Sequence, residues 1–354
     1  MAFKEPDTVE SEIIPVPIYK RLVERYHKGI VTQEFPPGSR IDSINELMHK
    51  HRVSRETAKL VLRKLAEEGL IIRQAGKGSF VSSLGPRHAA WGVIVPHWST
   101  HLQGVLSGLQ DRARQHGREV ESFVSYNNWR EEIRLVGTMV RQQYEAVIVV
   151  PTFDETATAA FYRNLDSGQS LVLLLDHTMA GSHFAYVIQS YDLGVRRAVQ
   201  YLLGRSPKAL AFMRNSVWPG RNMVQELMEV TFRDAVECAL PPVRAVVAGS
   251  IHNLSADWFR DLEINGIFCC DDLDAAGVVG RLKEWDIRIP DEVSVIGYGN
   301  TDLARYFTPG ITAINGHSED MAQKTAEIIS LRALGSDVHR QQHVILPTLV
   351  VRET

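Results

Sequence analysis

Cysteine and long apolar runs are scarce in this sequence of 354 residues, and both absences narrow what the protein can be. The three cysteines are Cys238 and the adjacent pair Cys269 and Cys270, an odd number without the spacing of a metal site. A disulfide framework is therefore not expected, and a reducing compartment is favoured. We interpret the three thiols as small apolar packing groups.

Signals for membranes and secretion are also missing. The longest apolar stretches, such as LVLLL at 171–175, are far shorter than the ~20 residues that a membrane-spanning helix requires. The first twelve residues, MAFKEPDTVESE, alternate acidic with polar side chains and contain no apolar core of a signal peptide. The sequence thus predicts a water-soluble protein of the cytoplasm without a membrane partner.

Signatures of catalysis are equally scarce. No Gly-rich dinucleotide fingerprint, P-loop or nucleophile elbow occurs between a predicted strand and a predicted helix, where each of these motifs must lie. His97 and His101 are four residues apart, as in a helical zinc site, but no glutamate follows His97 and the segment begins at a predicted strand end. We therefore expect no enzyme activity, no metal and no cofactor.

The length and the distribution of charge point to at least two parts. A single core stops growing near ~250–300 residues, so a chain of this length should divide into domains. Residues 14–85 contain 13 basic and 7 acidic side chains, whereas residues 86–354 contain 25 and 31. A polyanion is the natural partner of the basic segment, although an uneven split can also arise by chance.

The basic segment begins with two predicted helices. Apolar residues recur at helical spacing over 17–29, and the PPG triplet at 36–38 forces a turn after this first helix. Ser43 and Glu46 match a capping box, in which each side chain bonds the backbone N–H of the other residue. A second, short helix is therefore predicted over 43–51.

A third helix follows after a tight break. Ser54 is a good N-cap, Gly69 is a good C-terminal stop, and one face of the helix is apolar, at Ala58, Val61, Leu62, Leu65 and Ala66. The basic residues are left facing outward. Two helices joined in this way, the second with polar and basic residues in its first turn, form the arrangement that places a recognition helix in the major groove of DNA.

Two short predicted strands, LIIR at 70–73 and GSFV at 78–81, come directly after this helix. Gly76, Lys77 and Gly78 lie between or at the start of them, and glycine leaves room for a close approach of the backbone to phosphates. The pattern predicts a winged DNA-binding domain. The alternative is an ordinary surface helix followed by a hairpin.

Three segments carry a family resemblance: PIYKRLVERYHKGI, FPPGSRIDSINELMHKHRVSRETAKLVLRKLAEEGLI and GKGSFV. Together they resemble the winged helix-turn-helix domain of the GntR family over its whole length. The resemblance implies that the DNA-binding residues are Ser54, Arg55, Thr57 and Lys59 on the helix, with Gly76 and Lys77 in the wing. The family usually has Pro, Glu and Arg at the positions of Asp42, Ile44 and Asn45, so one expected DNA contact is missing and the operator sequence cannot be borrowed.

Beyond a linker at 83–89, apolar runs alternate with amphipathic segments. The runs are 91–95, 146–150, 171–175, 209–213, 266–269 and 293–297, and the predicted helices lie near 101–116, 130–143, 192–204, 224–238, 272–285 and 319–334. Strands that are apolar throughout fit parallel sheets covered by helices on both faces. The series is long enough for two doubly wound lobes, and such folds bind ligands beyond the carboxyl ends of their strands, between the lobes.

This second part resembles the LacI/GalR effector domain, whose fold is like that of periplasmic sugar-binding proteins. The resemblance rests on GVIVPHWSTHLQGVLSGLQDRARQHG, GIFCCDDLDAAGVVGRL, IPDEVSVIGYGNTDLARYFTPGIT and LPTLVVRE. It implies a DNA-binding domain over 14–82 and a ligand-binding domain over 90–354, with lobe one at about 90–189 plus 317–338 and lobe two at about 190–316 plus 343–352. The pairing is similar to bacterial sugar regulators of the arabinose-repressor type.

The resemblance carries over only part of the family's sugar site. Asp176 and Asp271 occupy positions that hydrogen-bond sugar hydroxyls in relatives, but Met228 stands at the usual sugar-anchoring arginine. Gly299 and Gly316 replace an aspartate and a glutamine. Because a buried carboxylate without a partner is costly, either the ligand or other residues must supply different groups, unless the pocket has lost its ligand.

Further candidate ligand contacts lie near strand ends. Trp98 could stack on the apolar face of a sugar ring, or pack as a core aromatic. Trp218 could approach the cleft from its loop, or cover the core. Tyr126, Asn253 and Asn300 could add hydrogen bonds.

Taken together, the sequence predicts a homodimeric transcriptional regulator, a repressor, that reads a palindromic operator and senses a sugar between two lobes. The alternative is a small-molecule carrier or enzyme with an incidental basic module.

Overall fold

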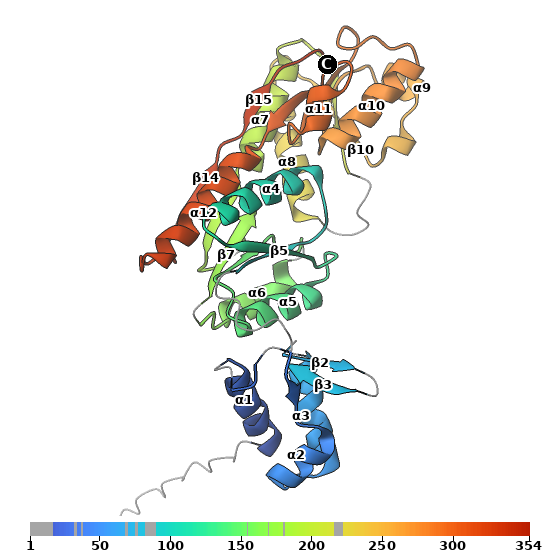
Figure 1. Cartoon of the computed structure of the whole chain (residues 1–354). Coiled ribbons are helices and arrows are strands. Elements are labelled where there is room, and N and C mark those ends of the chain that lie inside the picture. The colour runs from blue at the N-terminus through green and yellow to red at the C-terminus, as the bar shows by residue number, and fades with distance from the viewer. Residues whose placement is uncertain are drawn as a thin grey trace, which may run out of the picture. The chain divides into compact units, whose positions relative to one another are not determined.

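The structure is a computed structural model that describes residues 17–31, 34–36, 38–67, 70–74, 77–81, 90–153, 155–168, 170–179, 181–215 and 222–354. Its contacts divide the chain into two units with a boundary between Arg87 and His88. Figure 1 shows both units. Among these residues, no helix combines the length and the apolar content needed to cross a bilayer.

The first unit is a small winged helix-turn-helix. Its helices are α1 (Ile18–Val31), α2 (Ile44–His51) and α3 (Arg55–Glu67), and its strands are β1 (Arg40–Ile41), β2 (Ile71–Gln74) and β3 (Gly78–Val81). The strands form an antiparallel sheet in the order β1-β3-β2. These bounds confirm the three predicted helices and the two strands of the wing.

The helix ends follow from their capping residues. Glu46 N donates to Ser43 Oγ at 3.3 Å and Ser43 N donates to Glu46 Oε2 at 2.6 Å, which confirms the predicted capping box of α2. Arg52 ends this helix in the left-handed conformation, with φ of 51°. The predicted stop at Gly69 lies outside the described residues. The apolar face of α3 closes the core, where Ala58, Val61, Leu62 and Leu65 are buried.

The second unit consists of two lobes, each built on a six-stranded sheet (Figure 1). Lobe one contains β4 (Ala90–Val95), α4 (Thr100–Gln115), β5 (Glu119–Val124), α5 (Trp129–Arg141), β6 (Ala146–Val149), α6 (Glu155–Arg163), β7 (Leu171–Asp176), β8 (Ala185–Gln189), α12 (Ser318–Ala333) and β14 (Gln342–Ile345). Its parallel strands run in the order β14-β8-β7-β6-β4-β5. Helices α4 and α12 cover one face, and α5 and α6 cover the other.

Lobe two repeats this plan. It contains α7 (Tyr191–Leu203), β9 (Ala209–Met213), α8 (Met223–Glu237), β10 (Arg244–Ala248), the 3-10 turn η1 (Ile251–Asn253), α9 (Ala256–Asp261), β11 (Ile264–Cys269), α10 (Asp272–Glu284), β12 (Ser294–Tyr298), α11 (Asp302–Tyr306), β13 (Thr312–Asn315) and β15 (Thr348–Val350). The order is β10-β9-β11-β12-β13-β15, and only β15 is antiparallel to its neighbour. The predicted α/β class with two doubly wound sheets is confirmed.

One predicted boundary within the lobes is wrong. Residues 343–345 were expected in lobe two, but β14 pairs in parallel with β8 of lobe one, from Gln342 opposite Tyr186 to Ile345 opposite Gln189. The chain returns to lobe two only at β15. Three segments therefore cross between the lobes, and they bond one another: Ser190 N donates to Ile345 O at 3.1 Å, and His317 Nε2 lies 2.9 Å from Thr348 Oγ1.

Candidate functional sites

The first candidate site is the N-terminal turn of α3, which presents the predicted DNA-binding residues. Thr57 N donates to Ser54 Oγ at 3.2 Å, and the two hydroxyl oxygens are 2.9 Å apart, so Ser54 caps the helix as predicted. Arg55 and Lys59 are four residues apart, which places both exposed side chains on one face. The turn thus combines two cations with hydroxyl groups that are suited to contact phosphates and base edges.

Lys59 is held by a weak local ion pair. Its Nζ lies 2.8 Å from Glu56 Oε1, and both side chains are exposed, by 49% and 80%. An exposed pair of this kind contributes only about 0–1 kcal/mol. Lys59 can therefore exchange Glu56 for a phosphate at little cost.

The wing brings a further cation to its tip. Lys77 is exposed directly before β3, whereas Gly76 lies outside the described residues. Gly78 has φ of +117°, a conformation that strains other residues, and a Cβ placed there would lie 3.3 Å from Arg40 Nε. Arg40, which the sequence analysis did not single out, is exposed beside the start of the wing strand and adds to its positive charge.

Asp42, one of the departures from the family pattern, ties α1 to α2. It accepts a short hydrogen bond from the buried Tyr26 hydroxyl, and Lys50 Nζ lies 2.8 Å from the same carboxylate. His51 Nε2 is 2.9 Å from Tyr26 Oη. Burial opposes the charged form, yet the hydrogen bonds from Lys50 and Tyr26 hold the pKa of Asp42 below its usual range. A proline at this position could not make these bonds.

Tyr26→Phe should loosen the winged helix. The change removes one hydrogen bond to a charged group, for which we expect a loss of about 1.5–3 kcal/mol. Hydrogen exchange at the α1 amides of the full chain measures it, with Tyr19→Phe on the same helix as the control. The effect should be present at neutral pH and fade as the pH falls through the lowered pKa of Asp42. Equal exchange in both variants would contradict the role given to Tyr26.

The second candidate site is a cavity of about 280 Å³ between the two lobes. Its walls come from the carboxyl ends of parallel strands in both sheets: residues follow β4 and β6 or end β7 in lobe one, and follow β9 and β11 or end β12 in lobe two. This is the edge at which doubly wound folds bind ligands. The volume is near the lower end of ordinary ligand pockets.

Three predicted ligand contacts, Trp98, Asp176 and Asp271, line this cavity. Trp98 is 44% exposed on lobe one, and Leu273 is 58% exposed on lobe two, so a large apolar side chain lies in each lobe's wall. Trp98 is thus not packed as a core aromatic. Its indole face remains accessible to a ligand.

The Asp176 carboxylate is buried and already surrounded by protein partners. It accepts hydrogen bonds from Gln189 Nε2 at 2.7 Å and Tyr191 Oη at 2.8 Å. His101 Nε2 and His177 Nδ1 lie 3.3 and 3.2 Å from its oxygens. Burial opposes the charge, but the two imidazoles outweigh it and hold the pKa of Asp176 well below its usual range.

The resemblance implies a glutamine at position 316, where this chain has a glycine. The side-chain amide of Gln189 lies in that place instead. A Cβ on Gly316 would lie 2.5 Å from Gln189 Oε1, so this amide occupies the space that a side chain at 316 would require. Gln189 also accepts a hydrogen bond from the Tyr298 hydroxyl at 3.0 Å. The sequence analysis left open whether other residues or the ligand would supply the missing groups, and nothing in the sequence pointed to Gln189.

Gly316→Ala should destabilise the second unit. The added methyl group must displace a buried, fully bonded amide, and overpacking of this kind costs about 1–3 kcal/mol. Thermal unfolding measures the loss. The same substitution in a Gln189→Ala background should cost much less, and Gly280→Ala, where a Cβ would meet no neighbour, serves as the control. An equal cost in both backgrounds would show that Gln189 is not the obstacle.

Asp271 is fixed in the wall of the cavity as the N-cap of α10. Its Oδ1 accepts from Asp274 N at 2.7 Å, and its Oδ2 accepts a short hydrogen bond from the side-chain amide of Asn215. Burial raises the pKa of Asp271 despite these two donors. The carboxyl group therefore lies where a ligand hydroxyl could add a further hydrogen bond.

The predicted contacts Tyr126 and Asn253 do not reach the cavity. Tyr126 is 75% exposed and Asn253 is exposed in η1, and neither lines the cavity, because each follows an edge strand far from the centre of its sheet. Trp218 lies outside the described residues. Met228 does line the cavity, but it is 2% exposed and packs into the core of lobe two. It fills space and provides no charge in place of an arginine.

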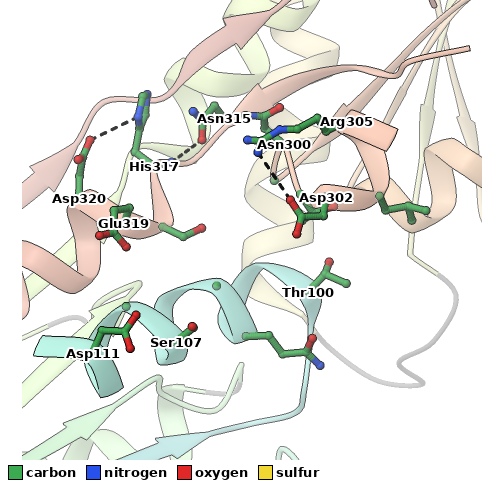
Figure 2. A pocket seen from close by; sticks show the side chains of 17 residues that line it. Thr100, Ser107, Asp111, Asn300, Asp302, Arg305, Asn315, His317, Glu319 and Asp320 are labelled. Carbon is green, nitrogen blue, oxygen red and sulfur yellow. Dashed lines mark hydrogen bonds and ion pairs between the residues drawn. The ribbon is translucent and has the colours of Figure 1, made fainter. Parts of the chain in front are cut away.

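Asn300 lines a separate outer groove of about 600 Å³ between α4, α11 and the start of α12 (Figure 2). Its Oδ1 accepts from Arg352 Nη2 at 2.5 Å. The acidic side chains of the groove are paired: Asp302 with Arg305, Asp320 with His317, Glu319 with Arg112, and Asp111 with Arg114. The groove offers a ligand little unpaired charge, so the inner cavity is the better candidate site.

These features define a class of protein: a winged DNA-binding domain joined to a two-lobed domain with a ligand cavity between the lobes. Residues 18–81 match the family described as bacterial regulatory proteins, gntR family, and residues 199–354 match the periplasmic binding protein-like domain. The chain thus combines these two domains, as the resemblances implied.

One relative matches nearly the whole chain, and solved structures share the fold over about three quarters of it. The arabinose metabolism transcriptional repressor of Halalkalibacterium halodurans is 23% identical over 95% of both chains. A periplasmic binding protein/LacI transcriptional regulator from Alkaliphilus metalliredigens, solved with D-xylulofuranose, superposes with a TM-score of 0.62 at 19% identity over 75% of this chain and 98% of that one. The Lac repressor dimer bound to operator and an anti-inducer gives 0.66 at 16% identity over 76% and 95%. The structural likenesses show the fold.

Proposed function

We propose that this chain is a cytoplasmic transcriptional repressor that binds a palindromic operator as a homodimer and responds to a sugar held between the lobes. The observation that carries the proposal is the exposed basic turn of α3, on a gntR-type domain, in the same chain as a two-lobed cavity lined from both sheets. The DNA-binding domain of the proposal spans 14–82 and the effector domain spans 90–354. Its DNA contacts are Ser54, Arg55, Thr57, Lys59, Lys77 and Arg40.

The proposed ligand is a small neutral sugar. Two relatives carry sugars in their names, arabinose and D-xylulofuranose. Among the described residues that line the cavity, the polar groups are amides, hydroxyls, imidazoles and carboxylates, which suit the hydroxyl groups of a sugar, and Trp98 offers a flat apolar face. We propose Trp98 and Asp271 as direct ligand contacts.

A salt titration tests the DNA-binding part. The operator is first selected from a random duplex library with the wild-type chain, and its affinity is compared with that of a scrambled duplex. Specific binding should weaken steeply as salt rises, because each phosphate contact releases counterions. Equal binding of every duplex would favour the alternative of a carrier or enzyme with an incidental basic module.

A thermal-shift screen tests the sugar-sensing part. Arabinose, D-xylulose and other small sugars are compared with amino acids and nucleosides, because a ligand bound only by the folded state raises its stability by mass action. At 100 times its Kd, a sugar should add about 2.7 kcal/mol. Trp98→Ala should remove the shift. A shift with another class of metabolite alone would overturn the assignment to sugars.

A further inference from the structure

Asp176 lines the cavity, but its hydrogen bonds connect the two lobes. His101 and His177 belong to lobe one, and Tyr191 is the first residue of α7 in lobe two. The Tyr191 hydroxyl lies 2.8 Å from both carboxylate oxygens. The buried carboxylate of Asp176, at the end of β7 in lobe one, thus accepts a hydrogen bond from Tyr191, the first residue of α7 in lobe two.

A second pair of hydrogen bonds, through Gln189, also connects the two lobes. Gln189, the last residue before the crossover, donates to Asp176 at 2.7 Å and accepts from the Tyr298 hydroxyl of lobe two at 3.0 Å. The rings of Tyr191 and Tyr298 stack with centroids 5.4 Å apart. Gly194 leaves room for this stack, because a Cβ there would lie 2.9 Å from the Tyr298 ring.

The network is also anchored next to another crossover. His101 Nδ1 lies 3.2 Å from Ser318 Oγ, and Ser318 begins α12 directly after the second crossover. Asp176, Gln189 and Tyr298 are at most 5% exposed, so their bonds form in a largely buried setting where hydrogen bonds are stronger than in water. The network therefore contacts two of the three crossing segments.

The backbone of Asp176 is held in an uncommon conformation. Its φ is +72°, in the left-handed region that a non-glycine residue seldom adopts unless its surroundings enforce it. The bonds to both lobes supply that enforcement. Such conformations cluster at active sites, ligand clamps and switch regions.

We propose that Asp176 and Tyr191 form an interlobe latch, which fixes the angle between the lobes without ligand and which a ligand hydroxyl opens by replacing the Tyr191 hydroxyl on Asp176. Both residues line the cavity, so a bound ligand faces the bond that it would replace. Asp176 then bonds the ligand only after its bond to Tyr191 has broken. The ligand-dependent half of this inference rests on the proposed function.

Tyr191→Phe tests the latch without DNA or sugar. The variant keeps the ring and its stacking and loses only the hydroxyl that reaches Asp176. Spin labels at Arg163→Cys on α6 and Glu237→Cys on α8, both exposed, report the distance between the lobes in a Cys238→Ser background. Labelled subunits are diluted with unlabelled ones. The mean or the width of the distance distribution should change by about 2 Å or more, the size of ordinary domain rearrangements.

Two further variants complete the experiment. Tyr186→Phe removes a hydroxyl that donates to Gln342 within the lobe-one sheet at 3.2 Å, and should leave the distribution unchanged. Tyr298→Phe removes the hydrogen bond from the Tyr298 hydroxyl to Gln189 and should act like Tyr191→Phe. The test therefore stays valid if one variant does not fold. Superposable distributions for wild type and both latch variants would overturn the proposal. Failure of operator or sugar binding would overturn the proposed function and leave the distance result standing.

Discussion

Arg55→Ala is expected to weaken binding to the selected operator by about 1–3 kcal/mol, or roughly 5- to 150-fold in Kd, and to relax its sequence preference. Arg55 is exposed in the first turn of α3, the position from which a recognition helix reaches base edges. An arginine that pairs with a base loses both bonds when truncated, whereas binding to a scrambled duplex depends on phosphates and changes less. Fluorescence anisotropy with both duplexes measures the ratio.

Lys77→Ala provides the matched comparison at the wing. A cation that contacts only phosphate should weaken binding to all duplexes alike and reduce the salt slope by about one. Arg163→Ala, an exposed arginine of the second unit, should change neither quantity. If Arg55→Ala lowers affinity for operator and scrambled duplexes equally, Arg55 is a phosphate contact and the bases are read elsewhere.

Glu132→Gln is expected to remove part of the pH dependence of the free energy of unfolding of the second unit. Glu132 lies in the first turn of α5 and is fully buried, where it accepts from Thr152 N at 2.6 Å and from the Tyr162 hydroxyl at 2.7 Å. Burial outweighs these donors and raises the pKa of Glu132 to about 7. The folded state therefore binds this proton more tightly than the unfolded state does.

The direction of the pH dependence follows from the linkage between protonation and folding. With a raised pKa, the contribution of Glu132 to stability is fully present below the unfolded pKa near 4.5 and is lost as the pH rises through about 7. The loss amounts to about 3 kcal/mol, since each pKa unit corresponds to about 1.4 kcal/mol. Between pH 5 and pH 8.5, the free energy of unfolding of Glu132→Gln should gain on that of wild type by this amount.

Urea unfolding at the two pH values measures this difference, and Glu119→Gln on the exposed part of β5 is the control. Burial also raises the pKa of Asp272 to about 6 and that of Asp274 to about 7. Because wild type and variant both contain these acids, their effects cancel in the difference between the two proteins. A variant that parallels wild type at both pH values would show that Glu132 titrates normally.

The parts of the fold that the sequence predicted are those with one strong physical signal. Strands β4, β6, β7, β9 and β12 are buried over their whole length, and β11 is buried at every position except Asn265. Their apolar runs predicted all six strands within two residues. The edge strand β5 was missed because polar residues interrupt its apolar positions, and β10 was missed because its apolar run is only four residues long, at 245–248. β14 was assigned to the wrong lobe because its pairing with β8 depends on a contact between distant segments.

Of the two candidate sites, one is specified by local sequence and the other depends on contacts between distant segments. The turn around Ser54 is specified locally by a cap and the spacing of the charges, and the structure forms it as predicted. The cavity depends on which strand ends meet. The resemblance correctly placed Asp176 and Asp271 in its wall, whereas closeness to a strand end was a correct guide for Trp98 but not for Tyr126, Asn253 and Asn300. No local pattern could show that Gln189 fills the space beside Gly316, because the two residues belong to different crossing segments.

The last crossing segment also determines how the chain must be synthesised. β14 completes the sheet of lobe one and β15 completes that of lobe two, with only residues 346–347 between them. A ribosome must therefore deliver the chain to Ile345 before lobe one is complete and to Val350 before lobe two is complete, and until then β8 and β13 each lack a pairing strand. Neither lobe can be produced from a continuous half of the chain, and cutting the gene at codon 190 should yield two fragments that aggregate unless they are made together.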